Sequence, residues 1–136
     1  MTPIIHQTAR FRATPELLIE LYLDSRKHSA STGAPAKVNR TVGGKFAAFN
    51  GAIHGTTLSV VPGKRIVQLW RAAHWKKEDS SIVILTFTPT ANGARIELVH
   101  VGVPEYDRKA VGKGWPKYYW KPWTKFLASL KKETPN

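Results

Sequence analysis

The chain has 136 residues, enough for one domain with a hydrophobic core, and we expect residues 1–136 to form that single domain. It contains no cysteine, which excludes disulfides, thiolate metal sites and cysteine nucleophiles. The formal net charge of +12 suits either an anionic partner or a lysine-rich surface, and because arginine is not concentrated in one stretch we expect no nucleic-acid partner.

The first part of the chain predicts a strand followed by two short helices. Residues 4–12 alternate weakly between apolar and polar side chains, as a strand does. Thr14, Pro15 and Glu16 form a helix start, with an N-cap, a proline at the first helical position and an acid in the first turn. Polar residues 24–31 predict a second short helix or turns. We find no long apolar run here, so we expect neither a signal peptide nor a transmembrane span, and a cytoplasmic protein.

The middle of the chain predicts six strands separated by turn pairs. Asn50-Gly51 is the strongest of the hairpin signals, and the short connections favour an antiparallel meander. The predicted strands are residues 37–42, 45–49, 52–61, 64–73, 81–88 and 94–103. Alternation along them predicts that one face of the sheet carries Trp70, Phe87, Leu98 and His100.

The stretch 114–130 predicts a long helix with two unlike faces. At about 100° per residue, an aromatic face and a lysine face lie opposite each other, with Tyr118 and Trp120 at the borders. Pro116 suits a first helical turn, whereas Pro122 does not suit a helix interior, so we expect a kink near residues 118–122 or a helix that restarts. The inward row is Trp115, Tyr119, Trp123, Phe126 and Leu130, and the outward row is Lys113, Lys117, Lys121 and Lys125.

These elements together predict an α+β domain. A curved antiparallel sheet of about seven strands wraps around the long C-terminal helix, and two short helices follow the first strand. A largely apolar space with a few polar groups is the usual form of a small-molecule site, so we expect a ligand between sheet and helix. The predicted ligand-binding residues are Gln68, Trp70, Phe87, Leu98, His100, Trp115, Tyr119 and Trp123.

Six motifs also occur in an order that resembles a known family, the activator-of-heat-shock-protein-90-ATPase homologues. The resemblance implies the START-like (SRPBCC, helix-grip) fold, whose members bind lipids, sterols, polyketides or plant phenolics. It also implies a link to the stress response and to co-chaperones that carry an additional N-terminal chaperone-binding domain, for which we expect no room here. The motifs are Gly43-Gly44-Lys45-Phe46, residues 51–55, residues 61–71, Leu85-Thr86-Phe87, Gly102-Val103-Pro104 and residues 114–119.

The residue types give little support for catalysis or metal binding. None of the nine acids clearly faces the predicted cavity, and the five histidines lack close metal-ligand spacing, so we expect no catalytic residue, metal or cofactor. His100 is the one titratable group to watch. It could bond a ligand oxygen or act as a base, but we favour a buried neutral histidine bonded to a neighbour.

Three functions follow as hypotheses. The first is a non-catalytic domain that holds a small hydrophobic or aromatic ligand. The alternative is a co-chaperone-like activator of a heat-shock-protein-90 ATPase, acting through its basic surface. The third is an enzyme of the polyketide-cyclase or hydrolase kind that uses His100 or a tyrosine. The lysine face itself is a solvated surface, an anionic-membrane contact or a docking site for an acidic protein.

Overall fold

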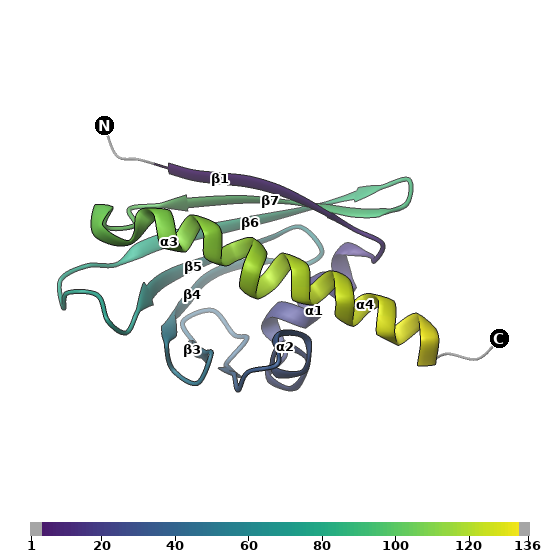
Figure 1. The fold of residues 1–136 in the computed structure, drawn as a ribbon, viewed down its shortest axis with the longest axis horizontal. Coiled ribbons are helices and arrows are strands. Elements are labelled where there is room, and N and C mark those ends of the chain that lie inside the picture. The colour runs from purple at the N-terminus through teal and green to yellow at the C-terminus, as the bar shows by residue number, and fades with distance from the viewer. Residues whose placement is uncertain (1–3, 134–136) are drawn as a thin grey trace.

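A computed structural model describes residues 4–133, which form one curved antiparallel sheet with a long C-terminal helix across it (Figure 1). The sheet order is β1-β7-β6-β5-β4-β3-β2, so the first strand lies at an edge beside the last. Within residues 4–133, no helix combines the length and apolar character needed to cross a membrane. The strands are β1 (Ile4–Phe11), β2 (Lys37–Val38), β3 (Lys45–Ala48), β4 (Ile53–Val61), β5 (Arg65–Ala72), β6 (Ser81–Thr90) and β7 (Gly93–Val101).

Two short helices follow β1, as the sequence predicts. In α1 (Pro15–Leu23), the Thr14 hydroxyl accepts a hydrogen bond from the Leu17 amide at 3.1 Å. Asp24 ends α1 and begins α2 (Ser25–Thr32), because its carboxylate accepts from the Lys27 amide at 2.9 Å. Such side-chain caps satisfy amide groups that have no partner within the helix.

The predicted inner face of the sheet is confirmed in its alternation. Every second residue of β5, of β7 and of β6 as far as Phe87 is buried, and the residues between them are more exposed. Because side chains in a strand alternate between faces, one face packs against the helices while the other meets solvent. The buried set includes Ile66, Gln68, Trp70, Val83, Leu85, Phe87, Ile96, Leu98 and His100.

One predicted strand is wrong over most of its length. Residues 37–42 were expected to be extended, but β2 ends at Val38. The cause is local, because the Asn39 side chain accepts hydrogen bonds from both the amide and the hydroxyl of Thr41. Such a side-chain turn competes with ladder pairing, and it leaves Val42 exposed.

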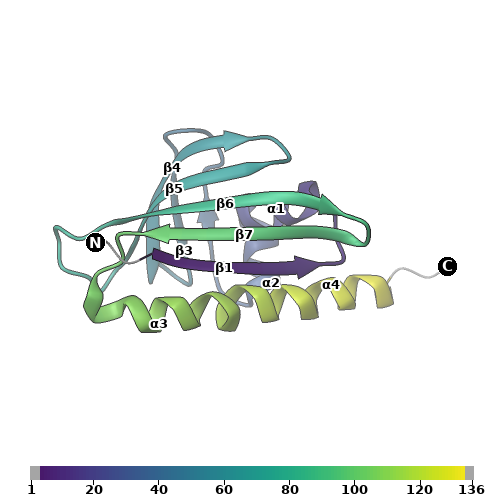
Figure 2. The same ribbon diagram turned by 90° about the horizontal axis from the view of Figure 1, so that it is seen from above.

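The C-terminal helix begins earlier than expected. It starts with α3 (Glu105–Trp115), passes through the π turn η1 (Pro116–Trp120) and continues as α4 (Lys121–Glu133). Pro116 therefore lies inside the helix, and its expected place in a first turn is wrong. Pro104 precedes the true start without a side-chain cap. Figure 2 shows the three segments as one continuous rod alongside β1.

In place of the kink or restart expected near residues 118–122, the helix has the π turn at Pro116–Trp120 and continues without a break. The Lys121 amide bonds to the Pro116 carbonyl, five residues back, instead of four. Pro116 has no N–H, so the Gly112 carbonyl lacks its helical donor. The Gln7 side chain of β1 replaces that donor at 2.6 Å, and its carbonyl accepts from the Trp120 indole at 3.0 Å.

The π turn changes which side chains point inward. In an unbroken α-helix, each step of four residues turns the side chain by about 40° around the helix axis. Leu127 is three such steps from Trp115, so it would point about 120° away from it. One extra residue in the π turn removes about 100° of that drift. Phe126 and Leu130, the other members of the predicted inward row, are only partly buried and pack against the edge of the core. The buried residues of the helix are Trp115, Tyr119, Trp120, Trp123 and Leu127.

Candidate functional site

A chain of buried hydrogen bonds joins the helix to the sheet at His100. The Trp115 indole donates to His100 Nδ1 at 3.1 Å, and His100 Nε2 lies 2.8 Å from the Ser81 hydroxyl. Ser81 in turn donates to the backbone carbonyl of Trp70 at 2.7 Å. Because an indole nitrogen can only donate, Nδ1 must be the unprotonated nitrogen and Nε2 must carry the hydrogen.

This environment keeps His100 neutral. Its side chain is fully buried, and desolvation lowers its pKa to about 3. A second proton on Nδ1 would face the Trp115 N–H, which cannot accept it. His100 is therefore bonded to its neighbours in the way that we favoured, and neither ring nitrogen is free to act as a base.

A second buried network joins the helix to α1, α2 and the sheet. His28 Nδ1 lies 2.8 Å from the Tyr22 carbonyl, so it donates there, and Nε2 accepts from the Tyr119 hydroxyl at 3.0 Å. Burial lowers the pKa of His28 and raises the pKa of Tyr119, so both groups stay neutral. The Tyr22 hydroxyl donates to Gln68 at 2.7 Å, and Gln68 donates to Thr57 at 3.3 Å.

All eight side chains of the predicted ligand site are buried. They form a packed interior, and the least exposed of them are Trp123, Leu98 and His100, each at 0%. Trp70 and His100 both contact the ring of Trp115, which places them against the helix. The polar side-chain atoms of Gln68 and Tyr119 form hydrogen bonds with neighbouring residues of the protein.

An open cleft lies beside this interior, between the helix and the ends of β4 and β5. Its volume is about 390 Å³. Three of the predicted site residues, Trp70, Trp115 and Tyr119, form part of its wall, whereas the other five do not line it. The full lining is Phe49, Ala52, Ile53, Trp70, Ala72, His74, Asp107, Ala110, Val111, Gly114, Trp115, Tyr118 and Tyr119.

One end of the cleft is aromatic and is held by a tight turn. Phe49 and Asn50 adopt φ angles of 53° and 56°, in the left-handed region that costs a residue with a side chain about 1 kcal/mol. This turn brings the Phe49 ring to 5.6 Å from Tyr118 and 5.3 Å from Tyr119, both edge to face. The hairpin expected at Asn50-Gly51 is present, and it supplies a wall of the cleft.

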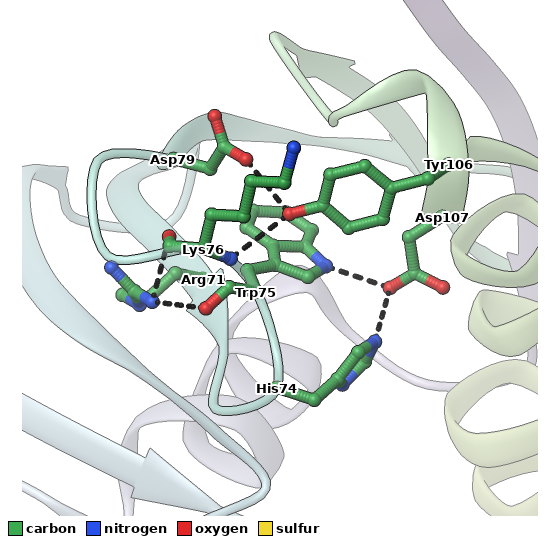
Figure 3. Close-up of polar contacts among 7 residues, drawn as sticks. All are labelled: Arg71, His74, Trp75, Lys76, Asp79, Tyr106 and Asp107. Carbon is green, nitrogen blue, oxygen red and sulfur yellow. Dashed lines mark hydrogen bonds and ion pairs between the residues drawn. The ribbon is translucent and has the colours of Figure 1, made fainter.

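The other end of the cleft is polar. Asp107 in the first turn of α3 accepts a hydrogen bond from the Trp75 indole at 2.7 Å (Figure 3). The same carboxylate oxygen lies 3.1 Å from His74 Nε2. The Asp107 side chain is 14% exposed and His74 is 67% exposed, so the pair sits at the rim. Residues 107 and 118 are eleven apart, which separates the two ends by roughly 16 Å.

Further bonds fix the loop between β5 and β6 against the start of the helix. Tyr106 donates to Asp79 at 2.7 Å and accepts from the Lys76 amide at 3.0 Å. Arg71 donates to the carbonyls of Trp75 and Lys76 at 3.1 and 3.2 Å (Figure 3). These bonds therefore fix the loop that carries His74 against the helical turn that carries Asp107.

A second hollow, of about 580 Å³, lies between α1 and the turn that joins β4 to β5. Its wall mixes Glu16, Lys64 and Arg65 with prolines, and Phe87 is its only aromatic side chain. It therefore lacks the aromatic surface that makes the first cleft suitable for a hydrophobic ligand.

Of the helical side chains that the structure describes, five lysines are exposed on the outer face, the predicted four and Lys109. Among the described residues none of them pairs with a carboxylate. They are spaced four residues apart, so the π turn that aligns the aromatic row also keeps the lysines on one side. We call Lys109, Lys113, Lys117, Lys121 and Lys125 the lysine row.

Several residues of these sites escaped the sequence analysis. His28 lies in a polar helix that gave no apolar stripe, and His74 and Asp107 lie outside every predicted strand and helix. The proximity of two titratable residues 33 positions apart leaves no pattern in one sequence. A signal was available for Phe49, because it precedes the Asn-Gly pair of a hairpin turn.

Comparisons with known proteins agree with the motifs. The sequence matches the family described as Activator of Hsp90 ATPase homolog 1-like protein over residues 12–131. A relative from Dictyostelium discoideum, an activator of 90 kDa heat shock protein ATPase homolog, is 30% identical over 111 residues, which cover 79% of this chain and 28% of that protein. The human activator homolog 1 is 29% identical over 109 residues, covering 80% of this chain and 32% of the relative. This chain thus spans less than a third of either relative.

The fold has a counterpart among solved structures. The crystal structure of an HSP90 activator from Plasmodium falciparum matches with a TM-score of 0.80 at 25% identity, covering 94% of this chain and 96% of the other. The helix-grip architecture and the order of the sequence motifs therefore have one explanation. The chain belongs to the family of Activator of Hsp90 ATPase homolog 1-like proteins.

Proposed function

We propose that this protein is a non-catalytic, cytoplasmic binding domain whose cleft takes a small hydrophobic or aromatic ligand of the lipid, polyketide or phenolic type. The observation that carries the proposal is an open, mostly apolar cleft of about 390 Å³ beside a closed interior. Such a volume lies within the range of about 300–1,000 Å³ that small-molecule sites occupy. The ligand would lie against Trp70, Trp115 and Tyr119, three of the residues predicted for it.

The proposed site has rigid walls. Trp115 stacks on Tyr119 at 5.0 Å and on Trp120 at 5.5 Å, and its indole is bonded to His100. A ligand would therefore meet surfaces that are already positioned, which reduces the entropy lost on binding.

Filling the cleft tests this proposal. Ala110 is exposed and lines the cleft, so Ala110→Trp should block it, whereas Ala128→Trp changes an exposed alanine of the same helix away from it. A panel of lipids and phenolic compounds is titrated into both variants and followed by NMR shifts of the tryptophan indole N–H groups. We expect binding to be lost in Ala110→Trp and retained in Ala128→Trp. Equal binding by both variants, or no ligand in the panel, would reject the cleft as the site.

A second candidate is a co-chaperone-like activator of a heat-shock-protein-90 ATPase, with a role in the stress response. Two observations favour it: the relatives named as activators, and the lysine row with its free positive charge. An acidic chaperone surface would fit a row of lysines that extends over 16 residues, or roughly 24 Å.

Charge reversal distinguishes specific docking through the lysine row from nonspecific binding by a basic protein. Lys113, Lys117 and Lys121 are changed together to Glu, and the matched control changes three exposed lysines elsewhere, Lys37, Lys45 and Lys64. If the lysine row docks, the first variant loses binding to the host chaperone and ATPase stimulation, and the control retains both. Binding by the original chain should weaken as salt rises from about 50 to about 300 mM. No binding at the lower salt would end this candidate.

A further inference from the structure

The polar end of the cleft presents hydrogen-bond acceptors. Asp107 Oδ2 is occupied by Trp75 and His74, and its other oxygen, Oδ1, has no partner among the described residues (Figure 3). Asp107 lines the cleft, so Oδ1 is the acceptor that it has left for a ligand. The carboxylate is held in place because the Trp75 indole, 4% exposed, must donate to it.

His74 adds a second acceptor. A carboxylate can only accept, so the hydrogen between His74 Nε2 and Asp107 belongs to Nε2. In a neutral imidazole the remaining nitrogen, Nδ1, is then an acceptor. The indole N–H of Trp70 has no partner, but it is buried and so does not supply a donor to the cleft.

We propose that the His74–Asp107 end of the cleft selects ligands that donate a hydrogen bond, of which an aromatic ring with a phenolic hydroxyl is the simplest. This rests on the proposed ligand-binding function and specifies its chemistry. An ether offers no hydrogen, so Asp107 would lose water without gaining a partner. A carboxylate ligand would place a second negative charge beside Asp107. Since the whole chain carries +12, rejection of a carboxylate would reflect this site and not the overall charge.

Three probes with the same pair of rings test the selection: 4-phenylphenol, 4-methoxybiphenyl and biphenyl-4-carboxylate. Each is titrated calorimetrically into the full chain at about pH 8. We expect the phenol to bind about tenfold or more tightly than the ether, as for a hydrogen bond to a charged group, and the carboxylate to bind most weakly.

The variant Asp107→Asn should reverse this order. The Trp75 indole and His74 Nε2 still require an acceptor, so the amide oxygen takes the Oδ2 position and the NH₂ group takes the Oδ1 position. The free acceptor becomes a donor, and we expect the carboxylate to bind more tightly than the phenol. Asp79→Asn is the matched control, because Asp79 lies in the loop that carries His74 but does not line the cleft, and it should leave the preference unchanged.

His74→Ala gives a second measurement if Asp107→Asn folds poorly, since His74 is exposed at the rim. We expect the preference for the phenol over the ether to fall by several-fold. Equal binding of phenol and ether by the original chain would overturn this inference while leaving ligand binding intact. Failure of all three probes to bind would remove both this inference and its basis.

Discussion

His100 has a pKa of about 3 in the folded protein, where its two neighbours allow only the neutral ring. In an unfolded chain a histidine takes up a proton near pH 6.5. Between these values the unfolded state binds more protons, so stability is fully present above about pH 6.5 and is lost as the pH falls towards 3. His28 shifts in the same direction, because burial lowers its pKa too.

We therefore predict that stability falls by about 2 kcal/mol between about pH 8 and pH 5 through His100 alone. Urea unfolding at both pH values, in the original chain and in His100→Gln, measures it. The variant should show a pH dependence smaller by that amount, although its overall stability is lower. His54→Gln, on the opposite side of its strand from the cleft, should retain the full dependence. A His100→Gln variant with unchanged pH dependence would contradict the assignment.

At the scale of single residues, the sequence could predict which face of a strand a side chain occupies, but not which residues it bonds to. Alternation along β7 correctly placed His100 on the buried face. Its neutrality depends on the Trp115 indole, and that contact forms only after the helix has been set on the sheet. His74 and Asp107 show the same limit, since 33 residues separate them and their distance depends on the whole fold.

At the scale of elements, Gln7 connects the edge strand to the irregular helix. It donates to Gly112 and accepts from Trp120, so it satisfies two groups that the helix leaves open. We predict that Gln7→Ala destabilises the protein by about 2 kcal/mol, because a carbonyl and an indole N–H lose their partners. Thr8→Ala is the control on the exposed side of β1 and should cost less than about 0.5 kcal/mol. If chemical denaturation shows similar losses of stability for both variants, the bonds from Gln7 to the helix do not contribute to stability.

The π turn makes a prediction about deletions. Removing Lys117 would take out the extra residue, and a regular α-helix would then place Trp123 and Leu127 each within about 20° of Trp115. Removing Lys125 instead would turn Leu127 away from the sheet by about 100°. We expect the first deletion to remain folded and the second to lose about 2–4 kcal/mol more, measured by thermal unfolding. Equal damage from both deletions would mean that the π turn does not set the alignment.

Among the elements, regular ones were predictable and locally overridden ones were not. The strands from β3 to β7 follow alternation and turn pairs closely. The strand expected over residues 37–42 stopped at Val38 because the Asn39 side chain competes with the ladder. The helix start at Glu105 escaped because Pro104 offers no cap and Gly112 and Gly114 lower helix propensity. A wheel at 100° per residue could not anticipate the change of pitch, so it left the buried Trp120 and Leu127 out of the inward row.

At the scale of the whole molecule, the net charge of +12 implies repulsion between like charges in the compact state. We predict that raising salt from about 20 to about 200 mM increases the thermal unfolding midpoint by a few degrees, since screening relieves that repulsion. The Lys113, Lys117 and Lys121 charge-reversal variant replaces three positive charges with three negative ones, which lowers +12 to +6, and it should respond less. A midpoint that falls with salt would indicate that attractive ion pairs dominate.

The architecture itself was predictable, because element order, strand alternation and the family motifs all pointed to one fold. Which part of the helix–sheet space would stay open could not be predicted. Openness depends on how completely side chains such as Trp123 and Leu98 fill the interior, and that is a property of packing in three dimensions. The cleft therefore appeared beside the predicted site and shared only part of its wall.

The bonds of Gln7 also bear on how the chain folds as it leaves the ribosome. Its partners Gly112 and Trp120 lie 105 and 113 residues further along, and β1 pairs with β7. β1 is therefore synthesised long before the residues that pair with it, and its contacts form only after they have been added. Such long-range closure slows folding. Until then, the Ile4–Phe11 segment would be unpaired and exposed, and holding chaperones could bind it. The order of the strands in the sheet thus bears on the contact between this protein and chaperones during its own synthesis.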